Sequence, residues 1–238
     1  MVISHNEIVV GCLKAFEALG LPKGQREDAA EAIGWLALHG QPFEQSLAQA
    51  LDTLRPDKLQ AKLLSQSGTA SVWDARGGSA LAIFPNLVDY ALVKAKATGQ
   101  HRLTVIHSPD IDLIWPYLDK TSSRLPWIEC RWRVAENEEM LVDFREDGGR
   151  IYHFQKQSAL RPREFELVVK RSESIAVRQI DDVILRVEIH SDWFQQKLKQ
   201  TQEGIRIDAK LWQNLVALGK GILVESTEES ERRGAGGV

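Results

Sequence analysis

The spacing of hydrophobic residues changes along the chain, from a helical period in the first part to strict alternation in the second half. In residues 4–19 hydrophobic side chains recur every three or four positions. Ser4 and Glu7 have the spacing of a capping box, and together these features predict an amphipathic helix. Between residues 128 and 134 hydrophobic and charged residues alternate, which predicts a strand with one buried face. A chain with both periods combines helices with a sheet.

The rest of the first half predicts helices followed by a βαβ-like unit. Further helices are expected over 24–38 and 42–54, and the short loops between them favour an antiparallel helical cluster. After Lys62 we expect a strand over 68–74, a turn over 75–78, a helix over 86–98 and a β-branched strand over 103–106. Asp110 then has the position of an N-cap for a further helix.

The second half is mainly β. The strands and helices expected there cover 128–134, 140–145, 150–154, 164–170, 183–189, 192–200 and a last helix that begins at Asp208. The predicted fold class is therefore α/β (α+β): an N-terminal helical cluster and βαβ-like unit, followed by a β-rich antiparallel half with a C-terminal helix. The two halves, 1–120 and 121–238, could be separate domains or one single domain. The polar, glycine-rich tail 225–238 is expected to be flexible.

Composition excludes several classes of function. Thirty basic residues against 33 acidic ones give a net charge of −3, which disfavours nucleic-acid binding. No apolar run approaches the roughly 18 residues of a membrane span, and the N-terminus has no leader pattern, so we expect a soluble cytoplasmic protein without a membrane partner. Two cysteines are too few for a four-thiolate zinc site, and the six histidines lack metal-ligand spacing. No metal is expected.

A first candidate site lies around His107, which directly follows the predicted strand 103–106. Asp110 comes three residues later, and Asp74 ends the other predicted strand. Loops at the carboxyl ends of parallel strands commonly hold the sites of α/β proteins, so these residues could form an acid–base site. The pattern also fits a helix-capping loop with a surface histidine, and this interpretation is favoured.

Two other groups are candidates for ligand binding. Gly77-Gly78 could let a phosphate approach the backbone, but the motifs of phosphate-binding loops are missing, so a tight turn is favoured. Arg131 and Arg133 share the polar face of one strand and could bind an acidic ligand through bidentate hydrogen bonds. Glutamates interleave with these arginines, which favours a cross-paired, solvated face.

Several segments of the chain resemble an uncharacterised bacterial family of unknown function. They are the opening Ser4-His5-Asn6-Glu7, the series Gly20…Gly24…Asp28-Ala29…Trp35-Leu36…His39-Gly40, and the closing Glu229-Ser230…Gly234-Ala235-Gly236. This resemblance spans the whole chain and implies no known activity. The last turn lacks the acidic residues of the family's ending.

The helical N-terminus, the segment 69–78, the predicted helix before Gly99 and Val105-Ile106-His107-Ser108 are similar to type-2 malate/lactate dehydrogenases. Those are NAD(P)-dependent homodimers outside the Rossmann fold. The resemblance covers residues 4–118 and places the family's Ser-His-Gly segment at 43–45 and its S-x-H-x-G segment at 108–112. Asp110 then stands where the family has its catalytic histidine. Because hydride transfer needs a proton donor of near-neutral pKa, and we expect Asp110 to be exposed, a shared fold is implied without shared chemistry.

Two hypotheses follow. The first is a homo-oligomeric accessory or ligand-binding protein on a dehydrogenase-like scaffold that lacks the catalytic histidine and needs no cofactor. The alternative is a small-molecule enzyme, an NAD- or NADP-linked oxidoreductase for example, with a site near His107, Asp110 and the turn at Gly77. This alternative requires that these residues converge on one pocket.

Overall fold

A computed structural model describes residues 1–122, 127–145, 148–155, 160–170 and 183–221. The tail 225–238, the residues Glu146-Asp147 of a predicted turn and the side chains of His153 and His190 lie outside the described parts.

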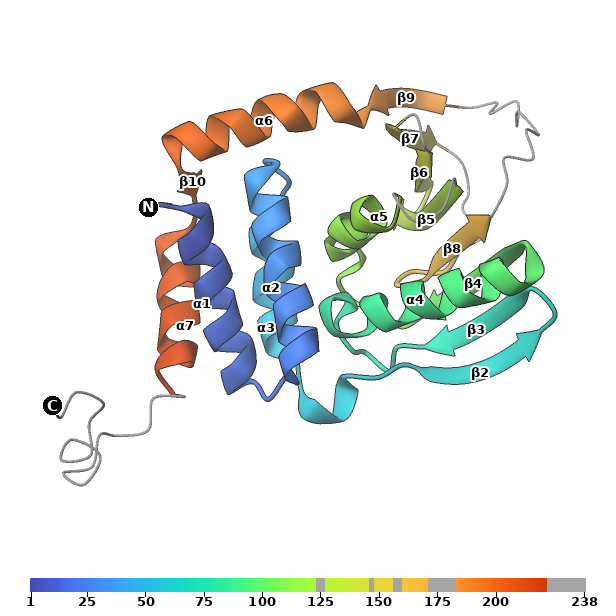
Figure 1. Ribbon diagram of the computed structural model, residues 1–238, viewed down its shortest axis with the longest axis horizontal. Coiled ribbons are helices and arrows are strands. Elements are labelled where there is room, and N and C mark those ends of the chain that lie inside the picture. Colours follow the sequence, from blue (N-terminus) through green and yellow to red (C-terminus); the bar gives the residue numbers. More distant parts are fainter. Residues whose placement is uncertain (123–126, 146–147, 156–159, 171–182, 222–238) are drawn as a thin grey trace, which may run out of the picture.

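Helices gather beside one end of the sheet (Figure 1). They are α1 (His5–Ala18), α2 (Lys23–Leu38), α3 (Glu44–Thr53) and α7 (Ala209–Lys220). The predicted capping box of α1 is confirmed, because the Ser4 hydroxyl accepts from the Glu7 N–H and the Glu7 carboxylate accepts from the Ser4 N–H. Short strands β1 (Val2–Ile3) and β10 (Ile205–Arg206) pair and bring the chain's N-terminus beside α7.

The main sheet has the strand order β2-β3-β4-β8-β5-β6-β7-β9, so both halves of the chain contribute to it. Its strands are β2 (Lys62–Ser67), β3 (Ala70–Asp74), β4 (Gln100–Ile106), β5 (Trp127–Ala135), β6 (Glu138–Arg145), β7 (Gly148–Gln155), β8 (Phe165–Lys170) and β9 (Val183–Glu188). The main hydrophobic core includes residues from Ile3 on β1 to Leu215 on α7, and a smaller separate cluster on β6 and β7 consists of Leu141, Tyr152 and Phe154.

The βαβ-like unit is present, and its two strands are parallel. β3 pairs with β4, and α4 (Ala80–Thr98) connects them. The strands that follow in the chain pair antiparallel, as the alternating pattern predicts. The predicted α/β fold class is therefore confirmed.

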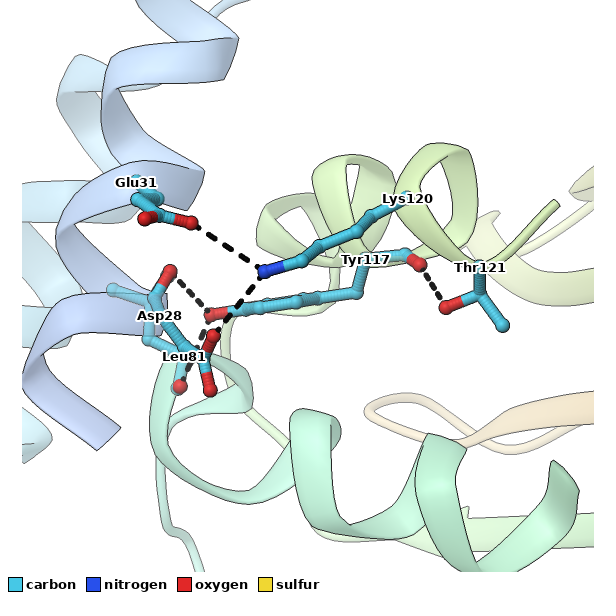
Figure 2. Close-up of polar contacts among 6 residues, drawn as sticks. All are labelled: Asp28, Glu31, Leu81, Tyr117, Lys120 and Thr121. Carbon is cyan, nitrogen blue, oxygen red and sulfur yellow. Dashed lines mark hydrogen bonds and ion pairs between the residues drawn. The ribbon is translucent and has the colours of Figure 1, made fainter. Parts of the chain in front are cut away.

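Helix α5 (Trp115–Ser122) joins the helical layer to the sheet. The Tyr117 hydroxyl donates to the carbonyl oxygens of Asp28 on α2 (3.4 Å) and Leu81 on α4 (3.2 Å). Figure 2 shows Lys120 reaching the carboxylates of Asp28 and Glu31, at 3.5 and 3.4 Å. Burial raises the pKa of the Tyr117 hydroxyl well above its usual value, so it remains a donor.

Four local predictions are wrong. β2 was not expected, because all six of its residues are exposed and show no hydrophobic alternation. α4 begins at Ala80 rather than residue 86, since Ser79 caps it and Pro85 is tolerated inside it. Gly219 is a residue typical of a helix end and predicts that the last helix stops there, but α7 continues through it, and Gly219 is buried against Lys14. α6 (Ile189–Glu203) is also longer than predicted.

Candidate functional site

The carboxyl ends of β3 and β4 bring two of the candidate residues together. Asp74 is the last residue of β3, and His107 directly follows β4. The Nδ1 of His107 lies 2.9 Å from the Asp74 Oδ1, although the side chain of His107 is 65% exposed. The pKa of Asp74 is lowered, first by the backbone N–H of Arg76 and then by His107.

The backbone around this pair is unusual. Among the described residues, the non-glycine residues with positive φ are Arg76 (56°), His107 (60°) and Arg163 (63°). They belong to adjoining loops, since the Gly77 N–H donates to the His107 carbonyl (3.1 Å) and the Ser108 N–H donates to the Arg163 carbonyl (3.0 Å). Such conformations cost roughly 1–3 kcal/mol each and occur most often at functional sites.

Asp110 does not join the Asp74–His107 pair. Its Oδ2 accepts a hydrogen bond from the Ser79 hydroxyl, and its Oδ1 accepts from the Ala80 N–H at 2.7 Å, so it closes the N-terminus of α4. Asp110 has the predicted N-cap position before η2 (Ile111–Ile114), but the expectation that its side chain caps that helix is wrong, because the side chain makes no such bond.

The expectation that Asp110 is exposed is also wrong. The residue is 2% exposed, and this burial raises the pKa of its carboxyl group to about 6. Sequence reasoning missed this position because its partners, Ser79 and Ala80, lie about thirty residues earlier in the chain. The one sequence signal was Ser79 itself, a good N-cap residue before an apolar run.

The glycine turn holds the loops in place. The Gly77 N–H donates to His107 and the Gly78 N–H donates to the Ala75 carbonyl (2.8 Å), so both amide groups are already engaged. A Cβ at Gly78 would lie 2.4 Å from the Lys58 carbonyl oxygen. Gly78 is thus fixed by close backbone packing, while its role in ligand binding stays a prediction.

A cavity of about 330 Å³ adjoins the loop that follows His107 and β4. It is lined by Ser108, Pro109, Ile111 and Asp112, by residues 132–136 at the end of β5, and by Pro162 and Arg163. Asp110 is not among the lining residues, although its neighbours on both sides are. The cavity therefore contacts His107's loop without contacting the buried carboxylate.

The two arginines of β5 differ in their partners. Arg131 is ion-paired with Glu129 (3.4 Å) and Glu166 (3.1 Å), which is the cross-paired arrangement. Arg133 lines the cavity, and its Nε donates to the Ala135 carbonyl (3.0 Å).

Metal-binding clusters and membrane-spanning helices are both absent from the described ranges. Within them, no group of three or more His, Cys, Asp or Glu side chains is placed to hold a metal ion. No helix in these ranges has the length and hydrophobicity needed to span a membrane. Cys12 and Cys130 are both buried and free.

Comparison with known proteins gives a partial family match and a fold. Residues 3–82 match the family described as "Protein of unknown function (DUF3726)", while no curated protein matches the chain. Among solved structures, a candidate malate/lactate dehydrogenase from E. coli has a TM-score of 0.70 at 10% identity, covering 98% of this chain and 99% of that one.

Two further solved structures have a similar fold. Malate dehydrogenase from Pyrococcus horikoshii has a TM-score of 0.66 at 12% identity, covering 94% of this chain and 96% of its own. Sulfolactate dehydrogenase from Methanocaldococcus jannaschii has a TM-score of 0.60 at 10% identity, with 92% and 97% covered. The likeness thus extends well beyond the residues 4–118 on which it was first recognised.

The positions that the resemblance assigns to the family's site hold structural residues. Phe43 is 5% exposed, and the Glu44 Oε1 accepts from the Asp208 N–H at 2.7 Å, next to the start of α7. The Asp110 side chain is likewise hydrogen bonded at the N-terminus of α4. The chain has a malate/lactate dehydrogenase-like fold whose N-terminal third matches a family of unknown function.

Proposed function

We propose that this chain is a ligand-binding protein that uses a dehydrogenase-like fold without hydride transfer. The main support for this proposal is the position of Asp110 and the hydrogen bonds that it accepts. It stands where the resemblance places a catalytic histidine, and both of its oxygens accept hydrogen bonds inside the protein. A general acid must reach the atom that it protonates, and Asp110 does not line the neighbouring cavity.

Ligand binding is supported by the cavity beside Ser108. It lies at the carboxyl end of β4, where open α/β sheets commonly bind small molecules, and its volume is within the range of such sites. Arg163 at the cavity and His107 just before Ser108 both have positive φ, a strained conformation that clusters at ligand-binding sites.

The proposal is tested by mixing the full-length protein with NADH or NADPH and a panel of 2-oxo acids, and following the absorbance of the reduced nicotinamide. We expect no oxidation above the protein-free rate. Oxidation that scales with protein concentration, and that persists after repurification, would refute the proposal. The Asp110→Asn variant is the matched control, because it keeps the shape of the buried side chain but removes the carboxyl group that could donate a proton.

An acid–base enzyme is the second candidate, and the contact between His107 and Asp74 favours it. A carboxylate at 2.9 Å from Nδ1 orients an imidazole and leaves Nε2 facing outward. If this pair is catalytic, both His107→Gln and Asp74→Asn abolish any turnover found, whereas His5→Gln on α1 leaves it unchanged.

Self-association is a separate part of the proposal. The dehydrogenase resemblance implies a homodimer, and we expect the protein to self-associate. Light scattering on a size-exclusion column measures the mass directly, and a monomer at every concentration would count against this part alone.

A further inference from the structure

Two positively charged and two negatively charged side chains line the cavity beside Ser108, and they do not form ion pairs with one another. Arg133 and Arg163 supply the positive charges, and Asp112 and Glu136 supply the negative ones. No ion pair within 4.0 Å joins either guanidinium to a carboxylate of any residue that the structure describes. Opposite charges around one small cavity that do not meet each other remain available to a bound molecule.

Two of these four side chains also make polar contacts within the protein. The Arg133 Nε donates to the Ala135 carbonyl at 3.0 Å, which fixes the stem but leaves the terminal nitrogens of the guanidinium. Burial raises the pKa of the Asp112 carboxyl group, and a hydrogen bond with the Trp132 side chain opposes this rise. Arg131, two residues before Arg133, has both Glu129 and Glu166 as partners and does not line the cavity.

Ser108 is a second, independent indication of a ligand. The residue is completely buried, and its Oγ has no hydrogen-bond partner among the described residues. Buried hydroxyl groups nearly always have a partner, because leaving one unsatisfied is unfavourable. Since Ser108 also lines the cavity, a bound polar group is a physically reasonable partner for this hydroxyl.

We propose that this cavity binds a small zwitterion of the α-amino acid class. The inference rests on the proposed ligand-binding function and names the ligand's chemistry. A carboxylate would lie against Arg133 and Arg163, and an ammonium group against Asp112 and Glu136. A ligand with only one charge would leave two side chains of the other sign without a partner. Trp132 and Ile111 give the cavity an apolar wall for a side chain.

The test uses matched ligands and the full-length protein. The protein amino acids are screened by thermal shift, and the best binder is then compared by calorimetry with its amide and its 2-hydroxy acid. The amide keeps the cation alone, and the hydroxy acid keeps the anion alone. We expect both analogues to bind at least about tenfold more weakly, since each loses one charge-assisted contact. Equal binding by the hydroxy acid, or no binding by any amino acid, would overturn the inference.

Variants locate the site. Arg163→Gln is expected to weaken the binding of the amino acid and the hydroxy acid but to leave amide binding unchanged. Glu136→Gln is expected to weaken the binding of the amino acid and the amide but to leave hydroxy acid binding unchanged. Arg161→Gln is the matched control, because it removes an exposed arginine from the same loop without altering the cavity lining. If all three variants weaken binding equally, the effect is general surface charge and the inference fails.

Ser108→Ala adds a readout that a purely structural role would not give. Removing an unsatisfied buried hydroxyl is expected to leave the melting temperature of the free protein unchanged or raised, while amino acid affinity falls several-fold. Loss of stability together with unchanged affinity would assign Ser108 to packing and contradict its place in the site. Failure of amino acid binding in a protein that also lacks turnover refutes only this inference. Nicotinamide oxidation refutes the proposed function as a whole.

Discussion

Two pairs of side chains lie at the same end of the same two strands but differ in burial and in the direction in which the carboxyl pKa is shifted. Asp110 and Ser79 are buried, with the carboxylate accepting from both a hydroxyl and a backbone N–H. Asp74 and His107 lie near the surface, with one contact between them and the imidazole largely in solvent. Both pairs join a residue near the end of β3 to a residue after β4.

The difference separates a structural carboxylate from an available one. Burial raises the pKa of Asp110, whereas hydrogen bonds lower the pKa of Asp74. Both oxygens of Asp110 accept hydrogen bonds inside the protein, and such a group contributes to folding. The Arg76 N–H and His107 both contact Oδ1 of Asp74, and the imidazole of His107 remains accessible to a ligand. The predictions below test this division, beginning with the largest effect.

Asp110→Ala should destabilise the protein most. The substitution leaves the Ser79 hydroxyl and the Ala80 N–H buried without their acceptor, and each loss costs about 1–3 kcal/mol. We expect a loss of about 3 kcal/mol in the free energy of unfolding at pH 5, which lowers the melting temperature by roughly 6–12 °C. Thermal unfolding measures this, and a loss below about 1 kcal/mol would show that Asp110 is not structural.

Asp110 should also make stability depend on pH. Its folded-state pKa of about 6 lies above the usual 3.8, so its contribution is fully present below pH 4 and is lost as the pH rises through 6. The loss between pH 4 and pH 7 is roughly 2 kcal/mol. Asp110→Asn removes this titration, so its stability relative to wild type should increase over the same interval. A difference that stays constant with pH would contradict the raised pKa.

Local sequence patterns were sufficient for most of the fold. The helix of residues 4–19 and the alternation of 128–134 each appear in the structure, because a capping box and a buried strand face are decided by neighbouring residues. β2 could not be found in the same way. It is an edge strand with exposed side chains, held by backbone hydrogen bonds to β3, and its sequence therefore carries no burial signal.

The site was only partly predictable for a related reason. The proximity of His107 to Asp74 follows from the rule that parallel strands end at the same sheet edge. The partners of Asp110 come from residues 79–80, and the cavity of Ser108 forms where segments 108–112, 132–136 and 162–163 meet. No pattern within one segment of the sequence indicates that distant segments meet in this way.

The glycine turn between the two pairs gives a smaller effect with a built-in control. Gly78→Ala places a Cβ 2.4 Å from the Lys58 carbonyl oxygen, so backbone must shift, and we expect a loss of about 2 kcal/mol. Gly77→Ala meets no atom closer than 3.9 Å but must hold a φ of +73°, which costs about 1 kcal/mol. Urea unfolding of both variants checks the order. If Gly77→Ala were the more harmful, backbone conformation rather than packing would dominate the turn.

The smallest effect is expected at the exposed pair. His107→Gln and Asp74→Asn remove one contact between groups that are 65% and 23% exposed, so each should change stability by no more than about 0.5 kcal/mol. The melting temperature should therefore stay within about 2 °C of wild type. A loss as large as that of Asp110→Ala would mean that the pair holds the strained loop at His107 in place. Unchanged stability leaves both side chains free for a ligand and sharpens the contrast with the buried pair.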